Sequence, residues 1–117
     1  YAGWNSGTLQ TALAVCPDAI TFQVPGKSKV AGKYSKTMFA TEFAMRLQEL
    51  SNGTFTQEVH DILASDRHAT VIVTEKLIRD GKSAEFRMVH VWRFEAGQPV
   101  AWYAYPRDLY QFDACWA

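Results

Sequence analysis

The sequence lacks a charge excess of either sign. Its 12 Lys and Arg residues are balanced by 12 Asp and Glu residues, so the formal net charge at pH 7 is zero. Proteins that bind nucleic acid through its phosphates carry a basic excess, so we expect no nucleic-acid partner. No apolar run approaches the roughly 18 residues of a membrane-spanning helix, and no signal-peptide pattern opens the chain. We therefore expect no membrane partner and a cytoplasmic location.

Cysteine is also scarce, with only Cys16 and Cys115, which lie far apart in the sequence. A disulfide between them is one interpretation, but we favour two free, partly buried thiols in a reducing compartment. A chain of 117 residues is long enough for one hydrophobic core and too short for two, so residues 1–117 are expected to form a single domain. Because the sequence begins with Tyr1 rather than Met, we expect its N-terminal helix to be truncated.

Aromatic residues, in contrast, make up 14% of the chain, and several fall in the stretch Glu85–Phe94. This stretch alternates with a period of two and is rich in β-branched and aromatic residues, which predicts a strand. One face of the strand is apolar apart from a single titratable group, and consists of Phe86, Met88, His90, Trp92 and Phe94. An imidazole in these surroundings is either a bonded histidine in a filled core or the polar centre of a pocket. We favour the pocket.

Helical signals are confined to the first half of the chain. An amphipathic stripe over residues 9–16 predicts a short helix that ends before a proline, and a second helix is expected over Lys36–Leu50, ended by Gly53. Between these helices, Ala19–Val24 is predicted to be a short strand. Val30–Tyr34 is either another brief strand or an extended connection.

After Gly53 the pattern changes from helical to alternating. Four strands are expected, at about Thr54–Leu63, Ala69–Arg79, Ala84–Phe94 and Pro99–Tyr105. The short gaps between them contain turn residues, which implies hairpins and an antiparallel meander. Helices followed by a run of strands predict an α+β fold in which N-terminal helices pack on a curved antiparallel sheet.

Several short motifs resemble, in their order and spacing, the nuclear transport factor 2-like superfamily and in particular its SnoaL-like branch. They are Trp4-Asn5-Ser6-Gly7, Val24-Pro25-Gly26, Ala31-Gly32-Lys33-Tyr34, Gly53-Thr54-Phe55, Glu58-Val59-His60-Asp61, Val89-His90-Val91-Trp92-Arg93 and Tyr105-Pro106-Arg107-Asp108. The resemblance spans essentially the whole chain and implies a cystatin-like cone with an apolar cavity. Relatives include ketosteroid isomerases, polyketide cyclases, epoxide hydrolases and dehydratases, and proteins that only bind ligands, so the fold does not fix the function.

The resemblance also suggests roles for individual residues. His90 falls where the isomerases place the acid of their oxyanion hole, and their base position falls at or near Gln23. Because glutamine cannot hold a proton near neutral pH, the isomerase reaction would lack its base. Asp108 beside Arg107 faintly resembles the aspartate–arginine arrangement of the epoxide hydrolases. His90 and Asp108 are therefore the candidate catalytic residues.

We expect the cavity to bind a small apolar molecule of steroid, terpenoid or polyketide type. The candidate ligand-binding residues are Gln23, Phe39, Phe86, Met88, Trp92 and Trp102. For Phe39 and Trp102, a place in the core is the alternative. Isomerase, cyclase or hydrolase-type acid–base chemistry assisted by His90 is one hypothesis. A non-catalytic ligand-binding or dimeric interaction module of the same fold is the other.

No cofactor is expected, and no metal site. His60 and Asp61 are neighbours on a strand and so point to opposite faces, and no third ligand has a suitable spacing. The outward face of the last two strands should be apolar where a solvated sheet is polar, and comprises Val89, Val91, Tyr103 and Tyr105. Apolar surface of this kind needs a cover, so we expect a homodimer through this face.

Overall fold

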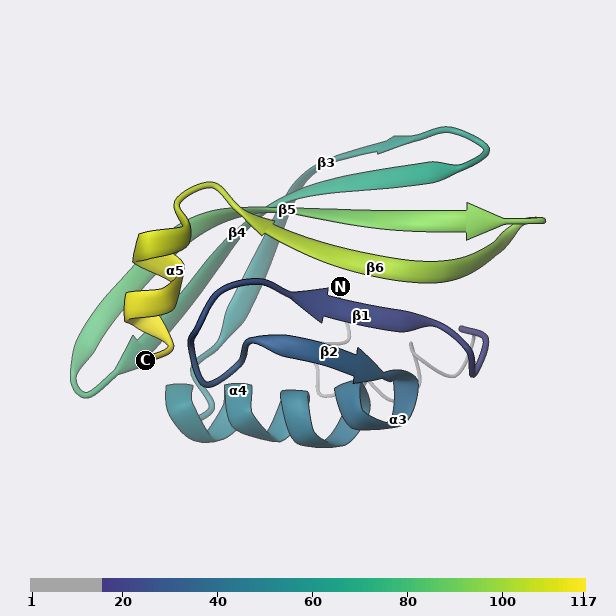
Figure 1. The fold of residues 1–117 in the computed structure, drawn as a ribbon. Coiled ribbons are helices and arrows are strands. Elements are labelled where there is room, and N and C mark those ends of the chain that lie inside the picture. Colours follow the sequence, from purple (N-terminus) through teal and green to yellow (C-terminus); the bar gives the residue numbers. More distant parts are fainter. Residues whose placement is uncertain (1–15) are drawn as a thin grey trace.

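Six strands form one curved sheet in the order β2-β1-β6-β5-β4-β3, with helices against its concave side (Figure 1). The computed structural model describes residues 16–117. The helices predicted before Pro17 therefore lie outside the described residues, except for Cys16. Among the described residues, no helix is long and apolar enough to cross a membrane.

The second half of the described chain is the predicted antiparallel meander. Its strands are β3 (Thr56–Ala64), β4 (His68–Arg79), β5 (Lys82–Glu95) and β6 (Gln98–Pro106). Each pairs with the next in antiparallel register. The hairpin before β5 turns at Asp80-Gly81, where φ is 53° and 77°, so both residues take the left-handed conformation that tight hairpin turns require.

The two short strands at the start of the described chain extend the sheet beyond β6. Strand β1 (Thr21–Val24) runs parallel to β6, which places Phe22 directly opposite Trp102. Strand β2 (Gly32–Ser35) pairs with β1 in antiparallel register. For Val30–Tyr34, where the sequence allowed a strand or an extended connection, the residues from Gly32 onward therefore form a strand. Because β1 and β6 are distant in sequence, this parallel pairing has no local turn signal.

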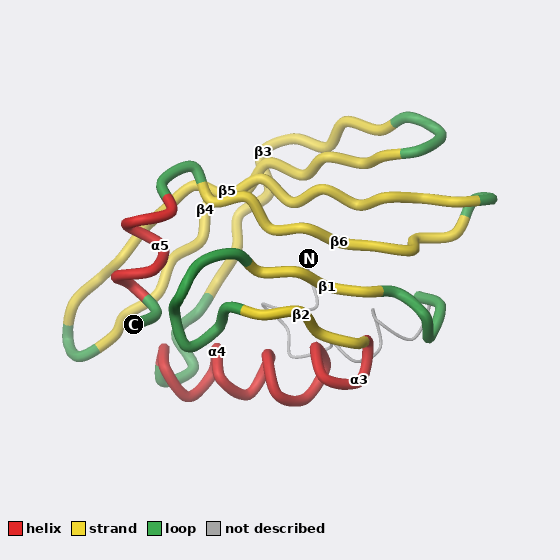
Figure 2. The backbone as a smooth tube through the Cα atoms, in the orientation of Figure 1, coloured by secondary structure: helices red, strands yellow, loops and turns green. Residues whose placement is uncertain are grey.

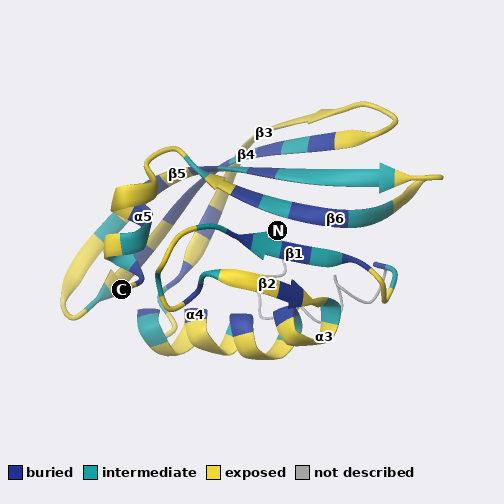
Figure 3. Ribbon diagram, viewed as in Figure 1, coloured by how far each residue is buried: buried dark blue, intermediate teal, exposed yellow. Residues whose placement is uncertain are grey.

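The predicted second helix is present and contains an irregularity. It consists of α3 (Lys36–Met38), a π-helical stretch η1 (Phe39–Phe43) and α4 (Ala44–Ser51). The Ser35 side chain caps its start by accepting a hydrogen bond from the Met38 N–H, and Asn52 ends it in the left-handed conformation. Buried and exposed positions alternate along this helix (Figure 3). It therefore faces the concave side of the sheet with one stripe only.

A last helix, α5 (Leu109–Cys115), follows β6 and was not predicted from the sequence. The Asp108 carboxylate caps it by accepting a hydrogen bond from the Gln111 N–H at 3.1 Å. The helix lies across the sheet at the end where β4 and β5 meet in their hairpin, away from α3 (Figure 2). The space between helices and sheet is thus bounded at this end by α5.

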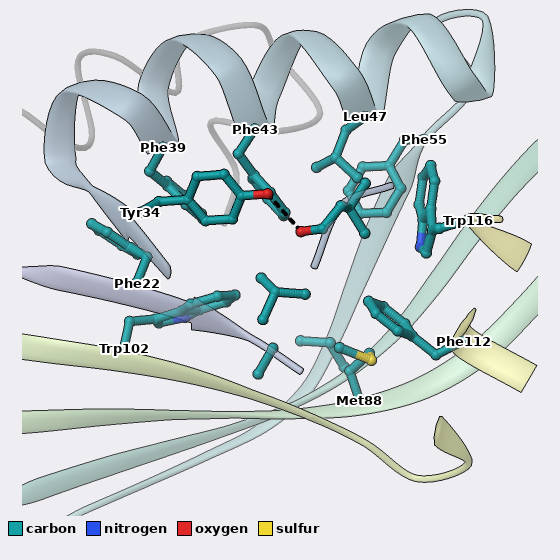
Figure 4. Close-up of a cluster of buried hydrophobic side chains, with 14 of the residues drawn as sticks. Phe22, Tyr34, Phe39, Phe43, Leu47, Phe55, Met88, Trp102, Phe112 and Trp116 are labelled. Atoms are coloured by element: carbon teal, nitrogen blue, oxygen red, sulfur yellow. Dashed lines mark hydrogen bonds between the residues drawn. The ribbon is translucent and has the colours of Figure 1, made fainter. Parts of the chain in front are cut away.

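The core fills the concave side of the sheet with aromatic rings. Phe39 stacks between Phe22, at 4.0 Å between ring centroids, and Phe43, at 4.6 Å. The Tyr34 hydroxyl donates a buried hydrogen bond to the Val30 carbonyl (Figure 4). The Cys16 and Cys115 thiols are both free, as favoured from the sequence.

Candidate active site in the concave core

A small cavity of about 20 Å³ lies in the core between α4, α5 and the sheet. Its lining is apolar except for three residues, Gln57, Glu75 and His90. A cavity of this size holds about one water molecule. The polar groups are nevertheless gathered on one side of a space that is otherwise walled by aliphatic and aromatic side chains.

Strand register brings the three polar residues together. Gln57 on β3 lies directly across from Glu75 on β4. His90 on β5 is paired with Val71, four residues before Glu75. The inward bend of the sheet, seen in Figure 1, lets the side chains of Glu75 and His90 converge over the concave face despite this offset.

The three side chains form a buried polar cluster. The Gln57 Nε2 donates to Glu75 Oε2 at 2.6 Å, and His90 Nε2 lies 3.6 Å from the same oxygen. The second separation is too long for a direct hydrogen bond. Exposed fractions are 8% for Gln57, 5% for Glu75 and 1% for His90, so all three groups are removed from water.

Burial shifts both titratable groups of the cluster toward their neutral forms. Desolvation raises the pKa of Glu75 to about 7, although the hydrogen bond from Gln57 opposes the shift. Desolvation lowers the pKa of His90 to about 3. The 3.6 Å separation would suit an ion pair, but the pKa shifts favour a neutral pair below pH 7, since burial penalises both charges. Near neutral pH the cavity therefore presents a neutral imidazole and a carboxyl group in mid-titration.

These two groups supply complementary chemistry. A carboxyl group whose pKa lies near the working pH can both take and return a proton. A neutral imidazole offers one N–H donor and one acceptor, enough to orient a carbonyl or hydroxyl oxygen. Apolar surroundings strengthen both interactions.

Two predicted ligand-binding residues share the cavity wall with His90. The rings of Trp102 and His90 lie 4.7 Å apart at an angle of 51°. Met88 precedes His90 by two residues on the same face of β5, and both Met88 and Trp102 line the cavity. Met88, His90 and Trp102, which were predicted to share the inward face of the β5–β6 hairpin, thus lie together at the cavity.

Three further predicted ligand-binding residues lie in the core outside the cavity lining. Phe39 is enclosed by the ring stack of the π-helical stretch. Phe86 packs edge-on against Phe112 at 5.6 Å. Trp92 is half-buried and contacts Trp102 edge-on at 6.4 Å. For Phe39 the structure corresponds to the core alternative.

Gln23 and Asp108 lie away from the cavity, in contrast to their predicted places. Along β1, Phe22 and Val24 are buried on the concave side, so the two-residue period turns Gln23 to the other face. Asp108 is exposed and its carboxylate is engaged in capping α5. Family position alone suggested these two residues, and neither of them lines the cavity beside His90.

Sequence reasoning missed Gln57 and Glu75, although a signal for Glu75 existed. Glu75 has the same parity on β4 as Val73 and Leu77, which are both buried. A carboxylate within an alternating apolar face is as unusual as the histidine on β5. Applying the same parity argument to β4 would have paired the two.

The possible metal ligands form no site in the described part of the chain. Within residues 16–117, no three His, Cys, Asp or Glu side chains are grouped as a metal ion would require. His60 is exposed, and its Nε2 lies 2.6 Å from the Thr74 hydroxyl, on the face opposite the cavity.

Comparison with known proteins adds to this geometry. Bal32a from a soil-derived mobile gene cassette is 25% identical, with a TM-score of 0.89, covering 100% of this chain and 90% of its own. TerC, co-crystallised with polyporic acid, is 18% identical with a TM-score of 0.83, covering 98% and 90%. IdmH from Streptomyces antibioticus, a proposed polyketide cyclase, is 16% identical with a TM-score of 0.74, covering 96% and 91%. No curated protein matches the chain.

The curved sheet with helices on its concave side is the cystatin-like, nuclear transport factor 2-like fold, shared with structures described in those words. The family model of the SnoaL-like domain matches residues 1–102. The chain therefore belongs to the SnoaL-like domain family.

Proposed function

We propose that the protein binds a small, mostly apolar molecule with one carbonyl or hydroxyl group, and that Glu75 and His90 carry out proton transfer on it. The observation that carries the proposal is the pair itself, a carboxyl and an imidazole buried side by side at the polar end of an apolar cavity. Burying two ionisable groups carries a desolvation cost, and apolar side chains in the same places would not have it. Perturbed titratable groups gathered at a cavity are typical of active sites.

The chemistry that fits is proton abstraction beside a carbonyl group. The Glu75 carboxylate takes the proton from the carbon, the electron pair of that C–H bond passes to the carbonyl oxygen, and the imidazole N–H of His90 stabilises the resulting enolate. Glu75, now protonated, returns the proton to another carbon or to oxygen. Isomerisation and the enolisation that begins a cyclisation both follow this sequence.

The relatives support the ligand class at the level of the fold. TerC was crystallised with polyporic acid, and IdmH is a proposed polyketide cyclase. Both identities are below 20%, so we transfer neither ligand nor reaction residue by residue. An apolar ring system with a carbonyl group is a class of ligand that this cavity chemistry also fits.

A non-catalytic module is the second candidate, and the cavity volume favours it. About 20 Å³ leaves no room for an organic ligand in the observed conformation. In that case the Gln57–Glu75–His90 cluster would be a structural feature of a filled core.

Binding and exchange measurements separate the two candidates. We would titrate a hydroxyanthraquinone, a steroid enone and a monoterpene ketone against the protein and follow quenching of tryptophan fluorescence. For any compound that binds, NMR in D₂O would follow deuterium exchange at the carbons beside its carbonyl group. The proposal predicts exchange catalysed by the wild type, retained in Glu58→Gln, an exposed carboxylate on β3, and lost in Glu75→Gln. Binding without catalysed exchange would contradict the proton transfer and leave a protein that only binds its ligand. The absence of binding would contradict the proposed function and leave the non-catalytic module with a filled core.

A further inference from the structure

The C-terminal end of the chain covers the cavity. Phe112 on α5 and Trp116 just after it both line the cavity, and they are 3% and 1% exposed. Figure 4 shows both rings pointing into the space between α4 and the sheet, Trp116 beside Phe55 and Phe112 beside Met88. The Phe55 and Trp116 ring centroids are 5.9 Å apart. The C-terminal segment thus fills space next to the polar cluster.

This segment is fastened to the loop between β1 and β2 by polar contacts. The Lys27 backbone N–H donates to both Asp113 carboxylate oxygens, at 3.1 and 3.2 Å, and the Lys29 N–H donates to the Trp116 carbonyl at 3.1 Å. The loop is shaped for this contact at Gly26, where φ is +98° and a Cβ would lie 2.1 Å from Asp113 Oδ1. Only glycine allows the carboxylate to approach the loop so closely.

Apart from these contacts, the segment is separate from the sheet that it covers. It follows β6 after a short connection, and no strand pairing involves it. Two further hydrogen bonds hold it, from Arg79 Nη1 to the Cys115 carbonyl at 2.8 Å and from Gln111 Nε2 to the Glu85 carbonyl at 3.1 Å. The outer face is unburied, with Tyr110 90% exposed. Swinging it outward breaks none of the hydrogen bonds between strands.

We propose that α5 and Trp116 form a lid over the Glu75–His90 cavity, latched by Asp113 on the backbone of Lys27, and that a ligand gains access when the latch releases. The lid rests on the proposed function for its purpose but not for its existence. It explains how a cavity of about 20 Å³ could serve a ligand, since ligand pockets typically measure 300–1,000 Å³. Withdrawal of the Trp116 and Phe112 rings opens the apolar space beside the polar cluster.

Amide hydrogen exchange, followed residue by residue by NMR, tests the lid in the unmodified protein. The Lys27 N–H donates to the Asp113 carboxylate and the Lys29 N–H donates to the Trp116 carbonyl, so these two amides report release of the segment. A lid predicts that these amides exchange by a local opening with little dependence on urea, while amides in the centre of β5 exchange only by global unfolding. Equal urea dependence at Lys29 and in β5 would overturn the proposal.

Variants test the latch. Asp113→Ala should speed exchange at Lys29 by roughly threefold to tenfold, the range expected for hydrogen bonds of this strength, and leave β5 unchanged. Asp66→Ala, which removes an exposed carboxylate in the turn between β3 and β4, is the matched control and should change neither. Gly26→Ala should act through Asp113, so adding it to Asp113→Ala should give less than the product of the two effects. No acceleration in Asp113→Ala would show that the carboxylate is not a latch.

Binding kinetics distinguish failure of the lid from failure of the proposed function. With 1-naphthol as a neutral aromatic probe, stopped-flow quenching of tryptophan fluorescence should show faster association with Asp113→Ala than with the wild type. Local opening without probe binding would keep the lid and contradict the proposed ligand site. Probe binding at equal rates in both proteins would keep the ligand site and overturn the lid.

Discussion

Replacing Glu75 by glutamine should change the stability of the protein in a pH-dependent manner. Burial raises the pKa of Glu75 from its usual value of 4.5 to about 7, so the folded state binds this proton more tightly than the unfolded chain. Stability therefore falls as pH rises from 4.5 to 7, in total by about 3 kcal/mol. Glutamine keeps the shape and the hydrogen-bond acceptor for Gln57 but carries no proton to lose. Relative to wild type, Glu75→Gln should gain about 3 kcal/mol between pH 4 and pH 8.

His90 shapes the pH dependence of both proteins with the opposite sign. Its pKa is lowered from 6.5 to about 3, so the unfolded chain takes up this proton first and stability falls as pH drops below 6.5. In the wild type the two effects offset each other between pH 4.5 and 6.5. In Glu75→Gln only the histidine remains of the pair, so stability should rise from pH 3 to 6.5 and then level off.

Urea unfolding followed by tryptophan fluorescence between pH 4 and pH 8 gives the measurement. The free-energy difference between Glu75→Gln and wild type is compared across the range, which cancels the contribution of His90, and an unchanged m-value confirms that the unfolding reaction is the same. Glu58→Gln, which replaces an exposed carboxylate on β3, is the matched control. A variation of less than about 1 kcal/mol for Glu75→Gln would refute the reasoning, because Glu75 would then ionise as an ordinary carboxyl group.

Three further predictions concern the cluster and the outer sheet face. His90→Phe removes the loss of stability on acidification, so its free energy of unfolding should rise relative to wild type as pH falls from 6.5 to 3. Chemical denaturation of both proteins at pH 4 and pH 7 checks this. The same free-energy difference between them at both pH values would contradict it. Gln57→Leu removes the hydrogen bond that lowers the pKa of Glu75, so ¹³C NMR of the Glu75 carboxyl should show a midpoint above pH 7. A midpoint at or below pH 7 would refute this prediction. We propose a homodimer through the outer sheet face, where Tyr105 is 54% exposed. Tyr105→Ser should weaken association in analytical ultracentrifugation. A wild-type protein that sediments only as a 13.2 kDa species at micromolar concentration would contradict the dimer.

The meander could be predicted from the sequence because its information is local. Turn residues such as Asp80-Gly81 separate alternating segments, and each strand finds its partner in the next one. The helix predicted over Lys36–Leu50, which the structure extends to Ser51, was found for a similar reason, since its apolar stripe and its end signal lie within a few turns. The π-helical stretch inside it has no comparable signal. It coincides with a tertiary contact, the stacking of Phe39 on Phe22 of β1.

The candidate site was only half predictable, because its other half depends on curvature and strand register. Parity placed His90 on the concave face correctly, together with Met88 and Trp102. Which residues of β4 approach His90 depends on how sharply the sheet bends, and Glu75 lies four residues from the register partner of His90. Helix α5 was missed because Leu109–Cys115 makes fewer than two full turns and carries little periodicity of its own.

The parallel pairing of β1 with β6 has a consequence for how the chain folds. Strands β3 to β6 can form one hairpin after another, on a timescale of about microseconds per hairpin, whereas β1 must wait for a strand at the other end of the described chain. During synthesis, β1, β2 and the helix after them emerge before the meander, and β6, the strand that anchors them, follows only after β3, β4 and β5. Until then the apolar concave face of the meander has no complete cover, and a chain arrested before Gln98 has no edge on which β1 can dock. Synthesis of β6 is therefore the step that commits the chain to its native state and ends the exposure of this face to aggregation.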